Sequence, residues 1–169
     1  MLKAIGIILV LTGTGGFGVA KAMQFYRTVR HLRELRNAVE ILKCEINYAL
    51  LPLPELCKAA AKRISGAPAQ FFRRFAALVE QGIDRDTAAA QALEQAHGLS
   101  LPSDAKMALL ELCSSLGCYD LDGENRVLQL TGHRIHSALE RCEAEKKMQA
   151  KSYAALGICT GIAIVILMI

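Results

Sequence analysis

The sequence predicts an all-α protein, an antiparallel six-helix bundle whose first and last helices extend into terminal transmembrane helices. Apolar residues in the middle of the chain recur at steps of three and four, which is the spacing of amphipathic helices. Short segments with glycine or proline separate these stretches, as expected between antiparallel neighbours. Near each end of the 169-residue chain lies an apolar run without charge. No stretch alternates as a half-buried strand would.

The C-terminal run, Tyr153 to Ile169, contains no charged residue and no proline. At about 1.5 Å per helical residue it spans roughly 26 Å, close to the hydrocarbon thickness of a bilayer. We therefore expect residues 152–169 to form a transmembrane helix. The alternative is a buried C-terminal core helix, although a single domain seldom hides a helix that is apolar on every face.

The N-terminal run, Ala4 to Ala20, is uncharged and rich in glycine. We expect residues 1–21 to form a second transmembrane helix and residues 22–151 to form the bundle between them. A secretory signal peptide is the alternative, with Ala20-Lys21-Ala22 as its cleavage site. Basic residues just past an apolar segment mark the side that stays in the cytoplasm, which argues against export. Those residues are Lys21, Arg27, Arg30, Arg33 and Arg36.

The formal net charge of +4 is unevenly distributed. Residues 37–140 hold 10 Lys/Arg against 13 Asp/Glu, whereas the two flanks together hold 10 against 3. The positive excess therefore lies beside the apolar runs, which indicates contact with a lipid bilayer rather than with nucleic acid. Both basic flanks face the middle of the chain, so we expect the bundle in the cytoplasm and both termini across the membrane.

The six cysteines form no C-x-x-C pair, and Cys159 lies inside the C-terminal run. Most of the others occupy apolar positions of predicted helices. We expect free, buried thiols rather than a disulfide framework, in agreement with a cytoplasmic domain.

The first bundle helix is predicted from a heptad seam over residues 32–49. Because no breaker lies between residues 19 and 51, the first membrane helix should run straight into it. Pro52 and Pro54 end this helix and start the next, whose apolar stripe covers residues 53–64.

The third helix should contain the centre of the core, because it carries three of the five phenylalanines. Pro68 is placed to open this helix and Gly82 to close it. Its predicted buried residues are Phe71, Phe72, Phe75, Leu78 and Val79.

An alanine-rich fourth helix, capped by Asp84 or Asp86, should end at Gly98. The fifth helix should be capped by Ser103 and terminated by Gly117. The last helix starts near residue 122 and continues without a breaker into the C-terminal run.

Two patterns suggest metal sites. His133, His136 and Glu140 share a helix face and could hold zinc, but the H-E-x-x-H spacing and a fourth ligand are missing, which favours a polar surface. The segment 120–124 is similar to a calcium loop in composition only, and its spacing favours a turn and helix N-cap.

The sequence has no Gly-rich phosphate loop and no Ser/His/Asp or Cys/His arrangement with a supporting context. We therefore expect a protein that is not an enzyme and has no cofactor. The membrane runs offer small-residue faces that would let the two helices pack closely, at Thr12, Gly16 and Ala20 and at Gly157 and Gly161.

Residues 46–55, Ile-Asn-Tyr-Ala-Leu-Leu-Pro-Leu-Pro-Glu, resemble the stage III sporulation protein AB family of endospore-forming bacteria. The segment Ser115-Leu116-Gly117, followed by Asp120, Asp122 and Glu124, is similar to the same family, as are the length and the two terminal runs. The resemblance extends over the whole chain.

This resemblance implies a place in the sporulation channel complex, in the mother-cell membrane facing the forespore. The family looks like one cytoplasmic domain of the platform proteins of type II secretion and type IV pilus machines. Such platforms couple a cytoplasmic secretion ATPase to other membrane proteins of the complex. This chain has a single bundle where those platforms have a duplicated domain, so self-association is one way to supply the missing copy.

Two other hypotheses remain open from the sequence. A secreted helical binding domain, released after signal cleavage and tethered by its C-terminal helix, predicts a mature N-terminus near Met23 and oxidised cysteines. A small metal-dependent membrane enzyme requires His133 and His136 to bind metal.

Overall fold

The computed structural model describes the backbone of residues 2–49, 51–118 and 120–168, and the side chains of residues 23–48, 51–118 and 120–145. These residues form six α-helices and no strand. The helices are α1 (Leu2–Ala49), α2 (Leu53–Arg63), α3 (Gly66–Glu80), α4 (Arg85–Gln95), α5 (Ser103–Ser115) and α6 (Leu121–Met168). The predicted six-helix, all-α architecture is confirmed.

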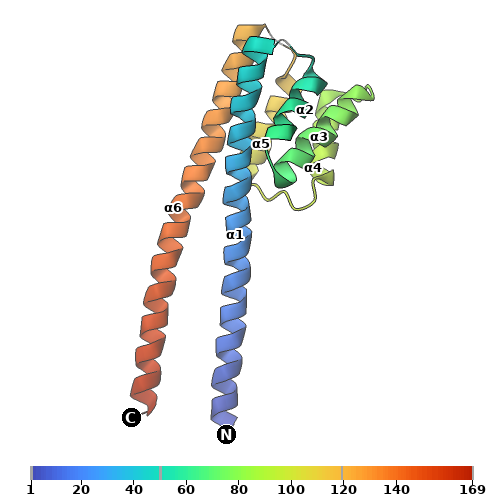
Figure 1. Ribbon diagram of the computed structural model, residues 1–169. Helices are drawn as coiled ribbons and strands as arrows, with labels where there is room; N and C mark the ends of the chain where they lie inside the picture. The colour runs from blue at the N-terminus through green and yellow to red at the C-terminus, as the bar shows by residue number, and fades with distance from the viewer. Residues whose placement is uncertain (1, 50, 119, 169) are drawn as a thin grey trace.

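Two helices are far longer than the others, and they set the shape of the molecule (Figure 1). Helices α1 and α6 each have 48 residues and run side by side in opposite directions. The four short helices pack against one end of this pair, and both chain termini lie together at the other end. As predicted, α1 passes through residues 19–49 without a break.

The six helices close into a ring. Each helix packs against the helix before it and the helix after it in the chain, and α6 packs against α1. Short linkers require antiparallel neighbours, and the helices alternate in direction around the ring. The side chains that point inward from all six helices form one core.

The aromatic centre of this core lies on α3, as the sequence predicts. Phe71, Phe72 and Phe75 are each fully buried. Phe71 meets Phe72 edge to face, with ring centroids 5.3 Å apart, and stacks on Phe75 at 6.3 Å. Leu78 and Val79, which were expected inside, are partly buried at the margin of the core.

Helix termini follow the predicted signals with two corrections. Asp84 caps α4 by accepting a hydrogen bond from the Asp86 N–H at 3.2 Å, and Gly82, Gly98 and Gly117 have positive φ after the preceding helices.

The prediction that Ser103 caps α5 is wrong, because the helix already begins at Ser103 and the cap position is Pro102. Pro68 does not open α3, which begins two residues earlier at Gly66.

Among the described cysteines all five are free, and Cys57, Cys113 and Cys142 are buried. Burial raises the pKa of the Cys57 thiol to about 12, and raises that of Cys113 well above its usual value. Both core thiols are therefore protonated and unreactive at neutral pH. Most of the described thiols are therefore free and buried, as expected, whereas Cys44 and Cys118 are exposed.

The predicted membrane segments, residues 1–21 and 152–169, lie outside the residues whose side chains are described. The same holds for Thr12, Gly16, Gly157 and Gly161, so their predicted packing face stays a prediction. Within the described part of the chain, no helix combines the length and the apolar character needed to span a bilayer.

Candidate partner-docking site at the far end of the bundle

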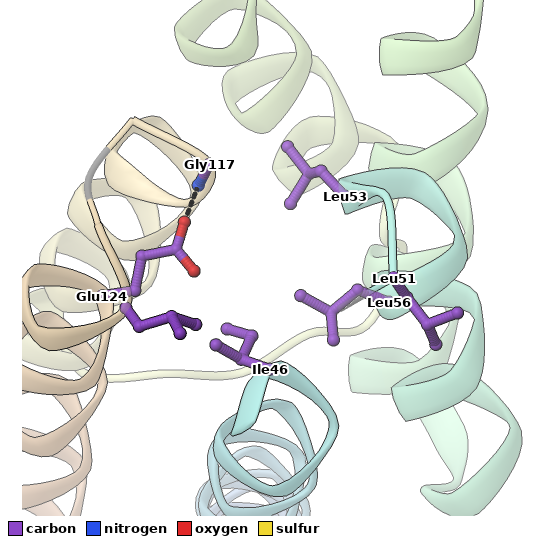
Figure 2. A pocket seen from close by; sticks show the side chains of 7 residues that line it. Ile46, Leu51, Leu53, Leu56, Gly117 and Glu124 are labelled. Atoms are coloured by element: carbon purple, nitrogen blue, oxygen red, sulfur yellow. Dashed lines mark hydrogen bonds between the residues drawn. The ribbon is translucent and has the colours of Figure 1, made fainter. Parts of the chain in front are cut away.

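Two segments that are far apart in the sequence meet at the end of the bundle opposite the termini. Residues 46–56 join α1 to α2, and residues 116–124 join α5 to α6. Between them lies a hollow of about 140 Å³. Figure 2 shows Glu124 and Gly117 on one side of it and Leu53 and Leu56 on the other. Its lining consists of Ile46, Leu51, Leu53, Leu56, Gly117, Leu121 and Glu124.

Prolines shape the first corner, between α1 and α2. Pro52 holds an extended conformation, with φ −57° and ψ 148°, and its carbonyl accepts the Leu56 N–H at 3.0 Å to start α2. Pro54 lies in the first turn of α2, where its missing N–H leaves no helical hydrogen bond unmade. The predicted role of both prolines at this helix boundary is confirmed.

Glycine and three charged side chains fix the second corner, between α5 and α6. Gly117 has φ +79°, and its N–H donates to Glu124 Oε1 at 2.7 Å. Arg85, from the start of α4, donates from Nη1 to the Leu116 carbonyl at 2.7 Å. Asp120 Oδ1 accepts the Gly123 N–H at 3.1 Å, which confirms the predicted turn and N-cap of α6. This corner is therefore held by groups from three elements.

A pair of amides joins the two corners. Asn47 Nδ2 donates to Asn125 Oδ1 at 3.0 Å, and Asn125 Nδ2 donates to Asn47 Oδ1 at 2.9 Å. The two bonds connect the last turns of α1 with the first turns of α6. They hold the segments that line the hollow at a fixed separation.

The surface around the hollow is apolar and acidic. Tyr48 is 86% exposed, Leu121 49% and Leu51 38%. Residues 46–56 and 116–124 together hold four carboxylates and no lysine or arginine, while Arg85 of α4 reaches the second corner and Lys58 of α2 pairs with Glu55. Exposed large apolar side chains beside charge of one sign are typical of a protein interaction surface, and they favour a partner with basic and aliphatic side chains.

The other sequence-predicted residues lie away from this end. Phe71, Phe72 and Phe75 are core residues and line no described surface. His136 Nε2 lies 3.4 Å from Glu140 Oε1, and His133 is on the same exposed side of α6. No group of three or more His, Cys, Asp or Glu side chains in the described part of the chain is placed to hold a metal ion.

Sequence reasoning missed the residues that connect the corners. No sequence pattern assigned a role to Asn125 or Arg85, and Asn47 stood out only as part of the segment 46–55. Their partners are far away in the sequence, so periodicity and capping patterns carry no signal for them. The motif segments themselves were identified, but not that they share one hollow.

The chain matches the stage III sporulation protein AB family over residues 3–169. It belongs to that family. The stage III sporulation protein AB of Bacillus subtilis (strain 168) is 25% identical over 170 residues, and the alignment covers 99% of each chain. A solved structure of stage III sporulation protein AB (SpoIIIAB) superposes with a TM-score of 0.65 and 24% identity, covering 72% of this chain and 98% of that one. The solved structure supports the helical fold of this family member.

Proposed function

We propose that this family member is a non-enzymatic membrane platform of the sporulation channel complex between mother cell and forespore. In this proposal both termini are held in the mother-cell membrane and the far end of the bundle binds a cytoplasmic secretion-type ATPase. The observation that carries it is the polarity of the molecule: the terminal apolar runs lie at one end, and an acidic, apolar hollow formed by the two family-like segments lies at the other.

Membrane attachment is supported by charge and geometry together. The two uncharged runs belong to helices that run side by side, so one bilayer could receive both. Basic residues follow the first run and precede the second, at the level where anionic lipid headgroups would lie. Those residues are Lys21, Arg27, Arg30, Arg141, Lys146, Lys147 and Lys151.

Docking at the far end is supported by the chemistry of its surface. Tyr48, Leu51 and Leu121 offer apolar area around a preformed hollow, and aromatic side chains of this kind often dominate binding energy. The corner hydrogen bonds hold this surface in one conformation before binding, which lowers the entropic cost of association.

The helix pair would transmit force from the ATPase to the membrane. Arg33 Nη2 bonds Glu143 Oε1 at 2.7 Å near the termini-proximal part of the bundle, and the Asn47–Asn125 pair joins the same two helices at the far end. With α1 and α6 tied together at both places and no flexible linker before the terminal runs, displacement of the far end would move the membrane helices.

Affinity capture of the ATPase of the same complex by the full-length protein in detergent would test this proposal. Tyr48→Ser combined with Leu121→Lys should weaken capture by about tenfold or more, because the pair removes apolar contact and adds a cation to an acidic surface. Arg73→Glu on α3 serves as a control, since it changes an exposed charge on a different side of the bundle.

Capture that persists unchanged in the double variant would exclude the far end as the docking site. Absence of capture by the unaltered protein would remove the ATPase from the proposal and leave the family assignment intact.

A further inference from the structure

A second surface groove runs along the seam between α1 and α6, on the outside of the ring. It consists of two adjoining hollows of about 480 and 210 Å³, which share Arg36 and His136. The buried side chains of Val39, Leu128 and Leu139 lie beneath it, and charged side chains line both edges. This groove is separate from the far-end hollow, because the two share no lining residue.

Two residues of α6, Gly132 and His136, set the character of this groove. Gly132 lies in the middle of α6, where glycine costs about 1 kcal/mol relative to alanine, and a Cβ added there would lie 3.6 Å from Val39 Cγ1, so α6 lies close to α1 at this level. Nδ1 of His136 is the one buried side-chain nitrogen or oxygen that has no hydrogen-bond partner among the described residues. A buried nitrogen without a hydrogen-bond partner is unfavourable, so this side of the seam contains an unmet hydrogen-bonding group.

The charges that α1 and α6 present to the groove are opposite in sign, and each pair lies at the same position along the helix axes. Arg33 of α1 bonds Glu143 of α6. Because the helices are antiparallel, Arg36 and Glu140 each lie one turn further from the termini, about 4.5 Å along the axis. Arg36 makes no ion pair or hydrogen bond with another described residue, and the recorded partner of Glu140 is His136, an ion pair that exists when the imidazole is protonated.

We propose that a second copy of this chain covers the groove, with Arg36 of each copy against Glu140 of the other. A two-fold axis parallel to α1 and α6 keeps every residue at its height and makes the contact isologous, so the ion pair forms twice. All four termini of the dimer then point in one direction, which fits the proposed attachment to one membrane. This orientation rests on the proposed function, whereas the contact between Arg36 and Glu140 is argued independently of it.

Small ligands fit the groove less well than a second copy does. A free anion would meet Glu40, Glu140 and Glu143 as well as the cations, and the described residues offer no three-ligand group for a metal ion. After a half rotation about an axis parallel to the helices, Arg33 and Arg36 on α1 of one copy would lie opposite Glu143 and Glu140 on α6 of the other. That property favours a copy of the chain itself.

Sedimentation of the full chain in detergent, at several protein concentrations, would measure the association. We expect a monomer–dimer equilibrium. Arg36→Glu alone and Glu140→Arg alone should each raise the dissociation constant by roughly a hundredfold, because two attractive contacts become two like-charge contacts. The Arg36→Glu/Glu140→Arg double variant should recover the dimer, because both ion pairs re-form with their signs exchanged.

Arg73→Glu is the matched control, since it makes the same charge change at an exposed position of α3. Circular dichroism of each variant checks that the helices are retained, and Arg36→Gln and Glu140→Gln serve if a reversal unfolds the chain. A protein that stays monomeric, single reversals that behave like the control, or a double variant that stays dissociated would each overturn the proposal. ATPase capture is a separate readout, so failure here and failure of the platform role are distinguishable.

Discussion

At the scale of single residues, Gly117 combines two constraints, of which Gly82 shares only the first. Its φ of +79° lies in the left-handed region, and a Cβ added there would lie 3.4 Å from Arg85 Nη1. Gly82 has nearly the same φ, +81°, but open space around it. Substitutions at these two glycines therefore distinguish the cost of backbone strain from the cost of contact with Arg85.

We expect Gly117→Ala to lower the free energy of unfolding by about 1–2 kcal/mol from backbone strain, with a further loss where the methyl group displaces Arg85 from the Leu116 carbonyl. Gly82→Ala should show the strain alone. Urea unfolding of both variants, followed by circular dichroism, measures the difference. Equal losses would mean that Arg85 moves aside without cost.

Phe75 tests the core at the same scale. It is fully buried and stacks on Phe71, so Phe75→Ala removes a large side chain and leaves a cavity among close-packed neighbours. We expect a loss of about 3–5 kcal/mol in the free energy of unfolding. The adjacent Arg74→Ala, at an exposed position, should change it by less than about 0.5 kcal/mol. A small effect at Phe75 would contradict the placement of the core on α3.

At the scale of elements, a polar contact ties the linker between α4 and α5 to α1. The Ser100 N–H donates to His31 Nδ1 at 3.1 Å, and the hydroxyls of Thr28 and Ser100 lie 2.7 Å apart. Because Nδ1 accepts this bond, His31 must be neutral there. Burial, followed by the nearby Arg30 and Arg27, lowers the pKa of His31 below its ordinary value of 6.5.

The sign of the pH effect follows from that direction. As the pH falls, the unfolded chain binds a proton at His31 at a higher pH than the folded chain does. The stability that neutral His31 contributes is therefore complete above pH 6.5 and is lost as the pH falls below 6.5 and through the folded pKa. In urea titrations from neutral to mildly acidic pH, His31→Gln should therefore lose less stability on acidification than the unaltered protein does. His97→Gln, at an exposed position of the same linker, should keep the original profile. Identical slopes for all three would exclude His31 as the source.

The sequence predicts the elements well where the signal is local. Asp84, Gly82 and Gly117 act at helix ends as their chemistry requires, because capping and positive φ depend on neighbouring residues. Ser103 fails as a cap because Pro102 already provides the extended residue before the helix. Exposed Cys44 and Cys118 show the limit of reading burial from residue type: the face that a helix turns inward is decided by its neighbours in the ring.

At the scale of the whole molecule, the fold class could be predicted from periodicity, but the hollow at the far end could not. Residues 46–56 and 116–124 were recognisable as two corners, yet their meeting depends on α6 closing the ring against α1. No local pattern encodes that closure. The α1/α6 groove likewise arises from two helices at opposite ends of the chain, and Gly132 alone gave no sign of it.

The proposed orientation relative to the membrane gives the last prediction, and Cys44 provides a native probe for it. Cys44 is exposed on α1, whereas Cys113 is fully buried in the core. In cells that make a variant with Cys44 as its single cysteine, a membrane-impermeant maleimide should label the protein after lysis and leave it unlabelled before.

A second variant that keeps Cys113 alone should resist labelling in both conditions until it is denatured, because its thiol is buried and its pKa is raised. This control establishes that the reagent reports accessibility in the folded chain. Labelling of Cys44 in intact cells would put the bundle outside and make the secreted helical domain the leading hypothesis. Protection before lysis would support a cytoplasmic bundle, with its acidic far end within reach of an ATPase.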